Sequence, residues 1–174
     1  MRINCSNSPS PKWRFARDRS SALWRCELKW RAYDVGMRIE NLDESFVTPV
    51  RTLWEVSGLT RPWNNPDRDY LDAIDGPASG VLGALGDSGL IGTVMVGYDG
   101  HRGWVYYLAV SPDYRNQGVG RALMESAENW LREHGARKLQ LMVRHTNESV
   151  ISFYDRLGYE DAETVVLAKW LEQS

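Results

Sequence analysis

The stretch AVSPDYRNQGVGRAL, residues 109–123, passes from a β-strand pattern to a helix pattern near its middle. Its first residues end an apolar run typical of a β-strand, and its last residues begin a helical spacing of apolar side chains. Gly118 and Gly120 lie at the junction, and Arg115 and Arg121 flank them. The first turn of a helix exposes unpartnered backbone N–H groups and the positive end of the helix dipole. The stretch therefore predicts a strand, a turn and a helix N-terminus suited to a phosphate.

Two interpretations of the glycines remain open at this point. Glycine at a strand–helix junction often serves only the turn, because it tolerates a positive φ. Alternatively, the missing side chains let the oxygens of a ligand reach the backbone N–H groups. The spacing matches neither familiar phosphate loop, since Leu123 stands where a dinucleotide fingerprint has its third glycine and no Gly-Lys-Ser/Thr sequence is present. The sequence thus indicates a phosphate site of a third kind.

The remaining chain alternates strand and helix patterns. Pro49 implies either that the first helix starts with Thr48 as its cap or that the helix is kinked there. Asn65 and Pro66 are typical of the cap and first residue of the second helix. The expected strands cover residues 37–42, 79–85, 89–98, 104–110, 138–143 and 163–171, and the expected helices lie within 43–58, 59–74, 119–134 and 147–158. This order predicts a mixed α/β fold with helices on both faces of one sheet.

Charge divides the chain of 174 residues into two parts. Residues 1–36 hold eight Lys and Arg against three Asp and Glu, a net of +5, whereas residues 37–174 hold thirteen against twenty, a net of −7. We predict a basic, disordered extension over 1–36, with Met37 as the natural start of the functional domain. A basic arm that binds nucleic acid or a membrane surface is the alternative, but the acidic main domain argues against nucleic acid as a partner.

Other features of the composition narrow the class of protein. No apolar run approaches the roughly 18 residues of a membrane span, so no membrane partner is expected. Cys5 and Cys26 are the two cysteines of the chain, too few for a disulfide framework or a metal site. We expect a cytoplasmic protein without a metal.

Two motifs resemble the GNAT acyltransferase superfamily. RNQGVG, residues 115–120, matches the family's R/Q-x-x-G-x-G/A motif between a strand and a long helix, and NESVISFYDRLGYE, residues 147–160, is similar to its Asn-x5-Phe-Tyr-x3-Gly-Phe/Tyr signature. RPWNNP and GYDGHRGWVYYLAV, which begin at Arg61 and Gly97, resemble the bacterial YpeA-like subgroup of small acetyltransferases. The resemblance covers residues 37–170. It implies a mostly antiparallel central sheet and an acetyl-CoA-dependent N-acetyltransferase that acts on an amine acceptor by direct transfer.

The resemblance also implies where acetyl-CoA binds. Its pantetheine arm should lie along strand 104–110 and bond the main chain near Leu108 and Val110, and Arg115 should add positive charge. Asn147 should contact the cofactor arm, although it is equally well placed to cap a helix and do nothing else. The pyrophosphate should be held by main-chain amides of Asn116, Gln117, Gly118, Val119, Gly120 and Arg121.

Tyr154 is the candidate catalytic residue. After an amine attacks the thioester, the departing sulfur needs a proton or a hydrogen bond. A phenol with an ordinary pKa near 10 can serve a thiolate whose own pKa is near 8.5. The alternative is a core aromatic, because Tyr154 lies beside the apolar face formed by Val150, Phe153 and Leu157.

The general base is not evident from the sequence. Some family members carry a glutamate on the central strand, but residues 103–110 contain no carboxylate. We therefore predict that deprotonation uses ordered water or the turn containing Asp99 and His101, where the histidine titrates in the right range. An acceptor with a low pKa would suit such a site.

Acceptor contacts are predicted on two segments. By resemblance, the loop TRPWN should face the thioester, which makes Arg61 and Trp63 candidates. Tyr106 and Tyr107 should alternate across their strand, so that one faces the site and the other the core. A CoA-binding sensor or interaction module without turnover remains the alternative function, and the sequence leaves homodimer formation open.

Overall fold

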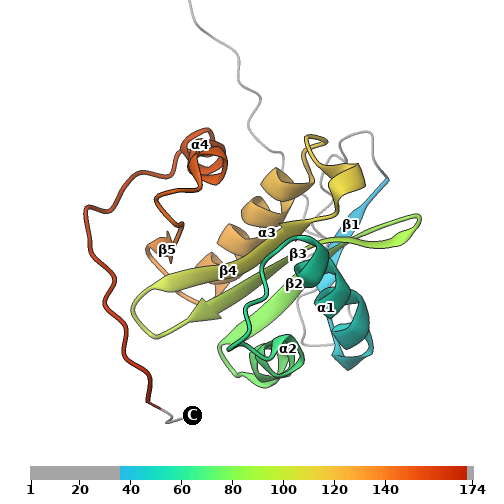
Figure 1. Ribbon diagram of the computed structural model, residues 1–174, viewed down its shortest axis with the longest axis horizontal. Coiled ribbons are helices and arrows are strands. Elements are labelled where there is room, and N and C mark those ends of the chain that lie inside the picture. Colours follow the sequence, from blue (N-terminus) through green and yellow to red (C-terminus); the bar gives the residue numbers. More distant parts are fainter. Residues whose placement is uncertain (1–35, 172–174) are drawn as a thin grey trace, which may run out of the picture. The chain divides into compact units, whose positions relative to one another are not determined.

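The computed structural model describes residues 36–171. The extension predicted for residues 1–36 therefore lies, apart from Gly36, outside the described residues. The described strands form one sheet in the order β1-β2-β3-β4-β5 (Figure 1). β1 pairs with β2, β2 with β3 and β3 with β4, each in the antiparallel direction. β5 pairs with β4 in the parallel direction, so the sheet is mixed, as predicted. The strands are β1 Arg38–Asn41, β2 Ser79–Gly86, β3 Gly89–Tyr98, β4 Gly103–Val110 and β5 Leu139–Leu141.

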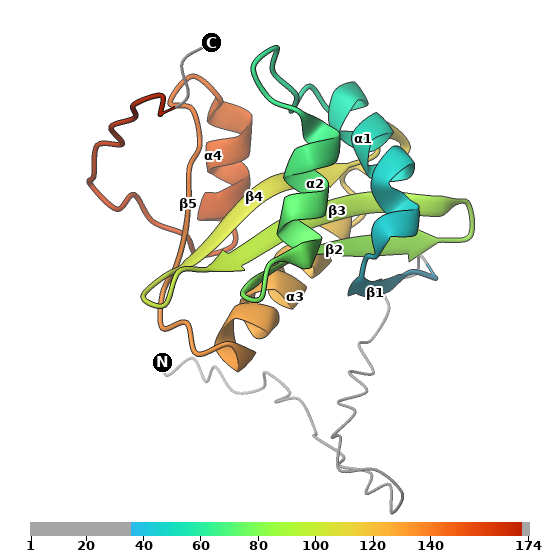
Figure 2. The same cartoon turned by 90° about the horizontal axis from the view of Figure 1, so that it is seen from below.

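Helices cover both faces of this sheet, which confirms the predicted layers (Figures 1 and 2). α1 (Val47–Val56) and α2 (Pro66–Asp75) lie on one face, and α3 (Val119–Glu133) lies on the other. α4 (Glu148–Asp155) packs against the core on the α3 side. Two short 3-10 helices, Glu44–Phe46 and Pro112–Tyr114, precede α1 and α3. Within the described residues, none of the helices has both the length and the apolar character that a membrane span requires.

The sequence pattern explains which face each helix buries. Leu123, Ala127 and Leu131 recur at a spacing of four along α3, and all three are buried against the sheet. On the opposite face, Val50 and Trp54 of α1 are completely buried. Each helix therefore contributes one apolar stripe to one of two cores separated by the sheet.

A β-bulge in β4 changes the direction of its side chains. Thr93 pairs with Ala109 and Met95 with Tyr106, so β4 has one more residue than β3 over this interval. Tyr107 takes up the extra length with a positive φ of 49°. Met95 belongs to the core on the α1 and α2 face, and so does Tyr107. Tyr106 and Tyr107 consequently point to the same face, and the predicted alternation between site and core is wrong because the bulge interrupts it.

Trp54 of α1 holds the bulge in place. The Trp54 ring stacks on the Tyr107 ring with centroids 4.0 Å apart. Trp54 Nε1 donates a hydrogen bond of 2.9 Å to Thr93 Oγ1, and both residues are fully buried. One tryptophan thus connects α1 to β3 and to β4.

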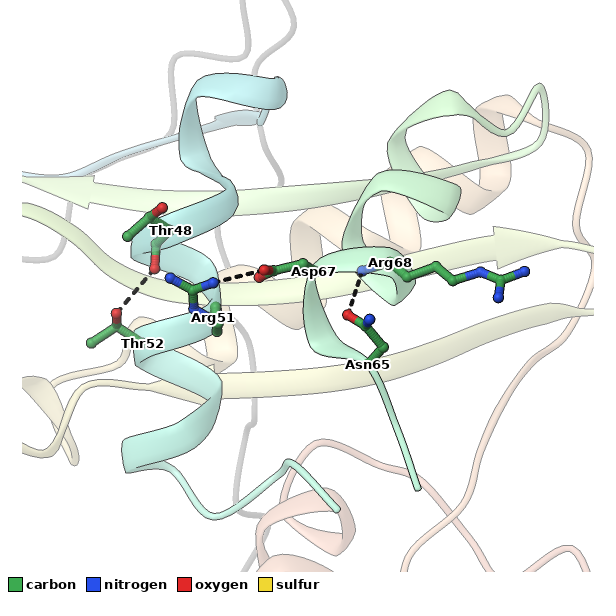
Figure 3. A network of polar contacts seen from close by, with 6 residues as sticks. All are labelled: Thr48, Arg51, Thr52, Asn65, Asp67 and Arg68. Atoms are coloured by element: carbon green, nitrogen blue, oxygen red, sulfur yellow. Dashed lines mark hydrogen bonds and ion pairs between the residues drawn. The ribbon is translucent and has the colours of Figure 1, made fainter. Parts of the chain in front are cut away.

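Polar contacts fix α2 beside α1 (Figure 3). Arg51 Nη1 of α1 donates to Asp67 Oδ2 of α2 at 2.7 Å. Asn65 Oδ1 accepts from the Arg68 backbone N–H at 3.1 Å, and Pro66 is the first residue of α2, which confirms the predicted cap. These contacts set where the side chains of the first turn of α2 lie.

The start of α1 differs from both predicted alternatives. The helix begins at Val47, and Phe46 occupies the capping position without a side-chain hydrogen bond. Pro49 is therefore the third helical residue. Its missing N–H costs nothing there, because the first N–H groups of a helix have no partner within it.

The predicted final strand is wrong. Residues 160–171 form neither helix nor strand. Val165, Leu167 and Leu171 are 85–90% exposed, although their spacing in the sequence suits a strand. A strand pattern describes side chains that fit a pleated surface, but a strand exists only when its backbone is paired. The three-residue β5 keeps an unpaired outer edge in the part of the chain that the structure describes.

Replacing Thr93 by valine should lower the free energy of unfolding by about 1–3 kcal/mol. Valine keeps the shape of threonine but leaves the buried Trp54 N–H without an acceptor. Thr52→Val is the matched control, since Thr52 is exposed and donates only to the Thr48 carbonyl of its own helix; it should change stability by about 0.5 kcal/mol or less. Urea denaturation measures both, and equal small effects would show that the buried hydrogen bond contributes little.

Candidate active site

The turn before α3 has the backbone of an anion site. Asn116 and Gly118 both have positive φ, of 60° and 86°. Alternating backbone conformations of this kind form a concavity lined by N–H groups. α3 begins at Val119, and no side chain caps its N-terminus. The N–H groups of its first turn are therefore available to a phosphate.

Gly120 differs from Gly118 in its backbone conformation. It lies inside α3, and the positive φ of this turn belongs to Asn116 and Gly118. A Cβ at Gly120 would lie 3.4 Å from the Phe153 ring and 3.7 Å from Val110 Cγ2. These are ordinary van der Waals distances, so neither the backbone conformation nor the packing excludes a side chain at residue 120.

Positive charge around the turn is not neutralised within the described residues. Neither Arg115 nor Arg121 pairs with a carboxylate there. Arg115 Nε donates to the Val110 carbonyl at 3.3 Å, which places the guanidinium beside the end of β4. Gln117 Nε2 donates to the Asp113 carbonyl and braces the turn. Both arginines can therefore reinforce the N–H groups of α3.

An unpaired edge of β4 continues from this site. β5 pairs only with Gly103–Val105, so residues 106–110 have no strand on that side among the described residues. Leu108 and Val110 lie on this stretch and turn their side chains toward the α3 core. Their backbone groups fit the predicted contact with a pantetheine arm.

Tyr154 lies where α4 meets the core. It is 8% exposed, and its ring meets those of Phe153 and Tyr159 edge-on at 5.1 and 5.5 Å. Burial raises the pKa of Tyr154 to about 12. The residue also lines a groove of about 920 Å³ formed with α3, β5 and residues 158–166. Tyr154 is thus both a core aromatic and a phenol that stays protonated.

Asn147 precedes α4 but does not act as a side-chain cap. No capping hydrogen bond is formed by its side chain. Its Oδ1 accepts instead from Ser149 Oγ at 3.2 Å. The exposed amide can therefore still contact a cofactor arm.

The carboxylate of Asp99 stabilises the turn between β3 and β4. Its Oδ1 accepts from the backbone N–H groups of His101 and Arg102 at 2.7 and 2.6 Å, and its Oδ2 accepts from Trp104 Nε1 at 2.8 Å. These hydrogen bonds lower the pKa of Asp99 to about 2, the one from Arg102 most strongly. Such a carboxylate is a poor proton acceptor. His101 is exposed on the same turn, and the geometry gives no support to a base at this position.

Of the two candidate residues of the TRPWN loop, Arg61 bonds its own loop and Trp63 is exposed. Arg61 Nη1 donates to the carbonyls of Gly58 and Thr60, so its guanidinium shapes its own loop. Trp63 is 60% exposed and can contact a ligand. Their neighbour Asn64 reaches β4.

Asn64 and Asp69 form a hydrogen-bonded chain with Tyr107 that sequence reasoning missed. Asn64 Nδ2 donates to the Tyr107 hydroxyl at 2.8 Å, and this hydroxyl donates to Asp69 Oδ2 at 2.7 Å. Burial and the neighbouring Asp69 carboxylate raise the pKa of Tyr107 to about 12. In the sequence, Asp69 is simply an acidic residue in the first turn of a helix. No local signal reveals this contact, because it depends on the bulge and on a partner 38 residues away.

Comparison with known proteins agrees with this architecture. The family model described as the acetyltransferase (GNAT) family matches residues 47–159. A protein of Yersinia enterocolitica named acetyltransferase is 41% identical over 135 residues, which cover 78% of this chain and 96% of that protein. An acetyltransferase of Yersinia pseudotuberculosis has the same identity and coverage.

Solved structures share the fold at lower identity. The aminoglycoside N-acetyltransferase AAC(6')-Iy in complex with CoA has a TM-score of 0.69 and 18% identity, over 79% of this chain and 96% of that one. A ribosomal-protein-alanine N-acetyltransferase from Brucella melitensis has a TM-score of 0.64 and 21% identity, over 77% of this chain and 99% of that one. By the match of the family model and of the Yersinia relatives, this chain belongs to the GNAT family of acetyltransferases.

Proposed function

We propose that this acetyltransferase moves the acetyl group of acetyl-CoA directly to a primary amine of a small molecule or of a protein N-terminus. Within residues 36–171, the N-terminus of α3 has no side-chain cap and the neighbouring edge of β4 has no paired strand, and this observation carries the proposal. One end of this surface suits a pyrophosphate and the other an extended pantetheine arm. Acetyl-CoA supplies an activated thioester carbonyl.

Binding at this surface uses main-chain groups more than side chains. The N–H groups of Val119, Gly120 and Arg121 point out of the first turn of α3, where the helix dipole is positive. Each charge-assisted hydrogen bond to a phosphate contributes about 1.5–3 kcal/mol net. Arg115 and Arg121 strengthen the positive field without needing a fixed contact.

Tyr154 assists the leaving sulfur as a hydrogen-bond donor. Its pKa of about 12 lies well above the usual value of about 8.5 for a thiol, so the phenol does not give up its proton completely to the thiolate. A hydrogen bond to the developing negative charge is still favourable and needs only that the phenol be protonated. The proton that finally neutralises the sulfur then comes from solvent.

Direct transfer is favoured by the residues available. Both cysteines, Cys5 and Cys26, precede the GNAT domain, so residues 37–174 offer no thiol for an acyl-enzyme. The acceptor amine must then attack the thioester itself. The structural neighbours include enzymes named for aminoglycosides and for a ribosomal protein, which supports testing both classes of amine.

An acceptor assay tests the proposal. The full chain is incubated with acetyl-CoA and one of three probes: a lysine-free tetrapeptide with a free N-terminus, spermidine, or kanamycin. Free thiol is measured with time, and mass spectrometry identifies the acetylated nitrogen. Thiol release that depends on the amine supports direct transfer. Tight CoA binding without release from any probe would favour a non-catalytic CoA-binding module and overturn the proposal.

Gly118→Ala should weaken CoA binding by about tenfold or more, because alanine disfavours the positive φ that aligns the N–H groups. Gly135→Ala is a closely matched control. Gly135 follows the other end of α3 with a φ of 88°, and a Cβ there meets no atom within 4 Å.

Both substitutions should cost about 1 kcal/mol of stability or more through backbone strain. Calorimetric titration with CoA separates them, since the dissociation constant should rise only for Gly118→Ala. Equal affinities in the two variants would place the pyrophosphate elsewhere.

Tyr154→Phe should lower kcat by about 10- to 100-fold and leave the dissociation constant of CoA nearly unchanged, because only the hydrogen bond to the leaving sulfur is lost. Tyr159→Phe removes a neighbouring hydroxyl that already donates to Glu128 Oε1 at 2.9 Å and should keep wild-type kcat. Steady-state rates with the most active probe measure both. A Tyr154→Phe enzyme with wild-type kcat would restrict this tyrosine to packing.

A further inference from the structure

We propose that the carboxylate of Asp69 binds the ammonium group of the acceptor, beside the bulge of β4 that carries Tyr107. This inference rests on the proposed transfer to an amine and adds the residue that selects a cationic acceptor. Asp69 lies in the first turn of α2, and its Oδ2 accepts a hydrogen bond of 2.7 Å from the Tyr107 hydroxyl.

The charge of Asp69 has no cationic partner among the described residues. The arginines of the surrounding elements are engaged elsewhere: Arg51 of α1 pairs with Asp67 at 2.7 Å, and Arg68 pairs with Asp72 at 3.5 Å. Arg61 of the preceding loop donates to carbonyl groups of its own loop. Asp69 is partly buried, so its negative charge is less well solvated than a surface carboxylate. A bound cation would offset that cost.

One oxygen of Asp69 remains open to a ligand. Tyr107 donates to Oδ2, whereas no hydrogen bond to Oδ1 is formed by the described residues. Among the described residues, the buried side-chain oxygens without a hydrogen-bond partner are Ser57 Oγ and Asp67 Oδ1. Asp69 Oδ1 has no partner either but is not buried in this way, so it keeps some contact with solvent. An ammonium group can thus approach Asp69 without displacing Tyr107.

The surroundings of Asp69 suit a cationic amine. Tyr107 is the bulge residue, and β4 has its unpaired edge from the neighbouring Tyr106 onward, where the thioester arm is proposed to lie. Tyr106 is 40% exposed and points to the same face as Tyr107, so its ring is also available to a ligand on this face. The face of a tyrosine ring attracts an ammonium group.

This arrangement also favours release of the product. The substrate approaches as a cation and loses one proton to water before its nitrogen attacks. The nitrogen loses a second proton to solvent as the C–S bond breaks, which balances the proton that the sulfur takes up, and the product leaves as a neutral amide. The carboxylate that attracts the amine therefore has no charge to hold after acetylation.

Asp69→Asn tests the assignment in the full chain, because asparagine keeps an oxygen that can accept from Tyr107 but removes the negative charge. We expect KM for the amine to rise by about tenfold or more, while kcat changes by about threefold or less. Asp72→Asn is the matched control: it removes the same charge from the same helix, where Asp72 is 71% exposed. KM should be unchanged in this control. The three probes of the acceptor assay serve as substrates, and calorimetry with CoA measures cofactor binding.

The outcomes separate this inference from the proposed function. Wild-type turnover with an unchanged amine KM in Asp69→Asn would overturn the assignment and leave the transferase intact. If Asp69→Asn weakened CoA binding and also lowered the melting temperature, Asp69 would have a structural role, and the assignment would be overturned as well. Absence of wild-type turnover with every probe would overturn the proposed function and, with it, this inference.

Discussion

One extra residue in β4 is the constraint on which the arrangement of the site depends. The bulge gives Tyr107 a positive φ and turns Tyr106 and Tyr107 to the same face of the sheet. A non-glycine residue in this conformation costs about 1–3 kcal/mol and persists only where its surroundings hold it. Trp54 stacks on the Tyr107 ring and donates to Thr93 beneath it, and Asn64 and Asp69 hold the hydroxyl. The strain is thus offset by contacts from three other segments.

The sheet separates two opposite electrostatic environments. On the α3 side, the first turn of the helix and two arginines that pair with no carboxylate among residues 36–171 form the proposed site for the diphosphate of CoA. On the α1 and α2 side, Asp69 offers a negative charge to an amine. Residues 37–174 carry a net charge of −7, yet the proposed ligand of α3 is an anion. Local dipoles and a few positioned charges decide such binding, because charges farther away than about 10 Å are largely screened by salt.

Local patterns predicted much of the fold because they act over a few residues. Asn65 and Pro66 begin α2 as their chemistry requires, and Gly118 has the predicted positive φ at the start of α3. The predictions failed where a non-local partner decides the outcome. The pattern of residues 163–171 satisfies a strand, but no pairing exists for it among the described residues. The predicted role of the Asp99 turn as a base gains no support, and the reason is local: donors two to five residues farther along the chain bond the carboxylate and favour its ionised form.

The sequence by itself determined the order of strands and helices as far as α4, the turn at Gly118 and the two motifs of the GNAT family, because each depends on residues close together in the chain. Only the tertiary structure decided the direction of Tyr107 and the contact between Tyr107 and Asp69. A bulge is a mismatch between two strands, so it is a property of their pairing and not of either strand alone. For the same reason the carboxylate that contacts Tyr107 comes from α2 and is not evident from the sequence of β4.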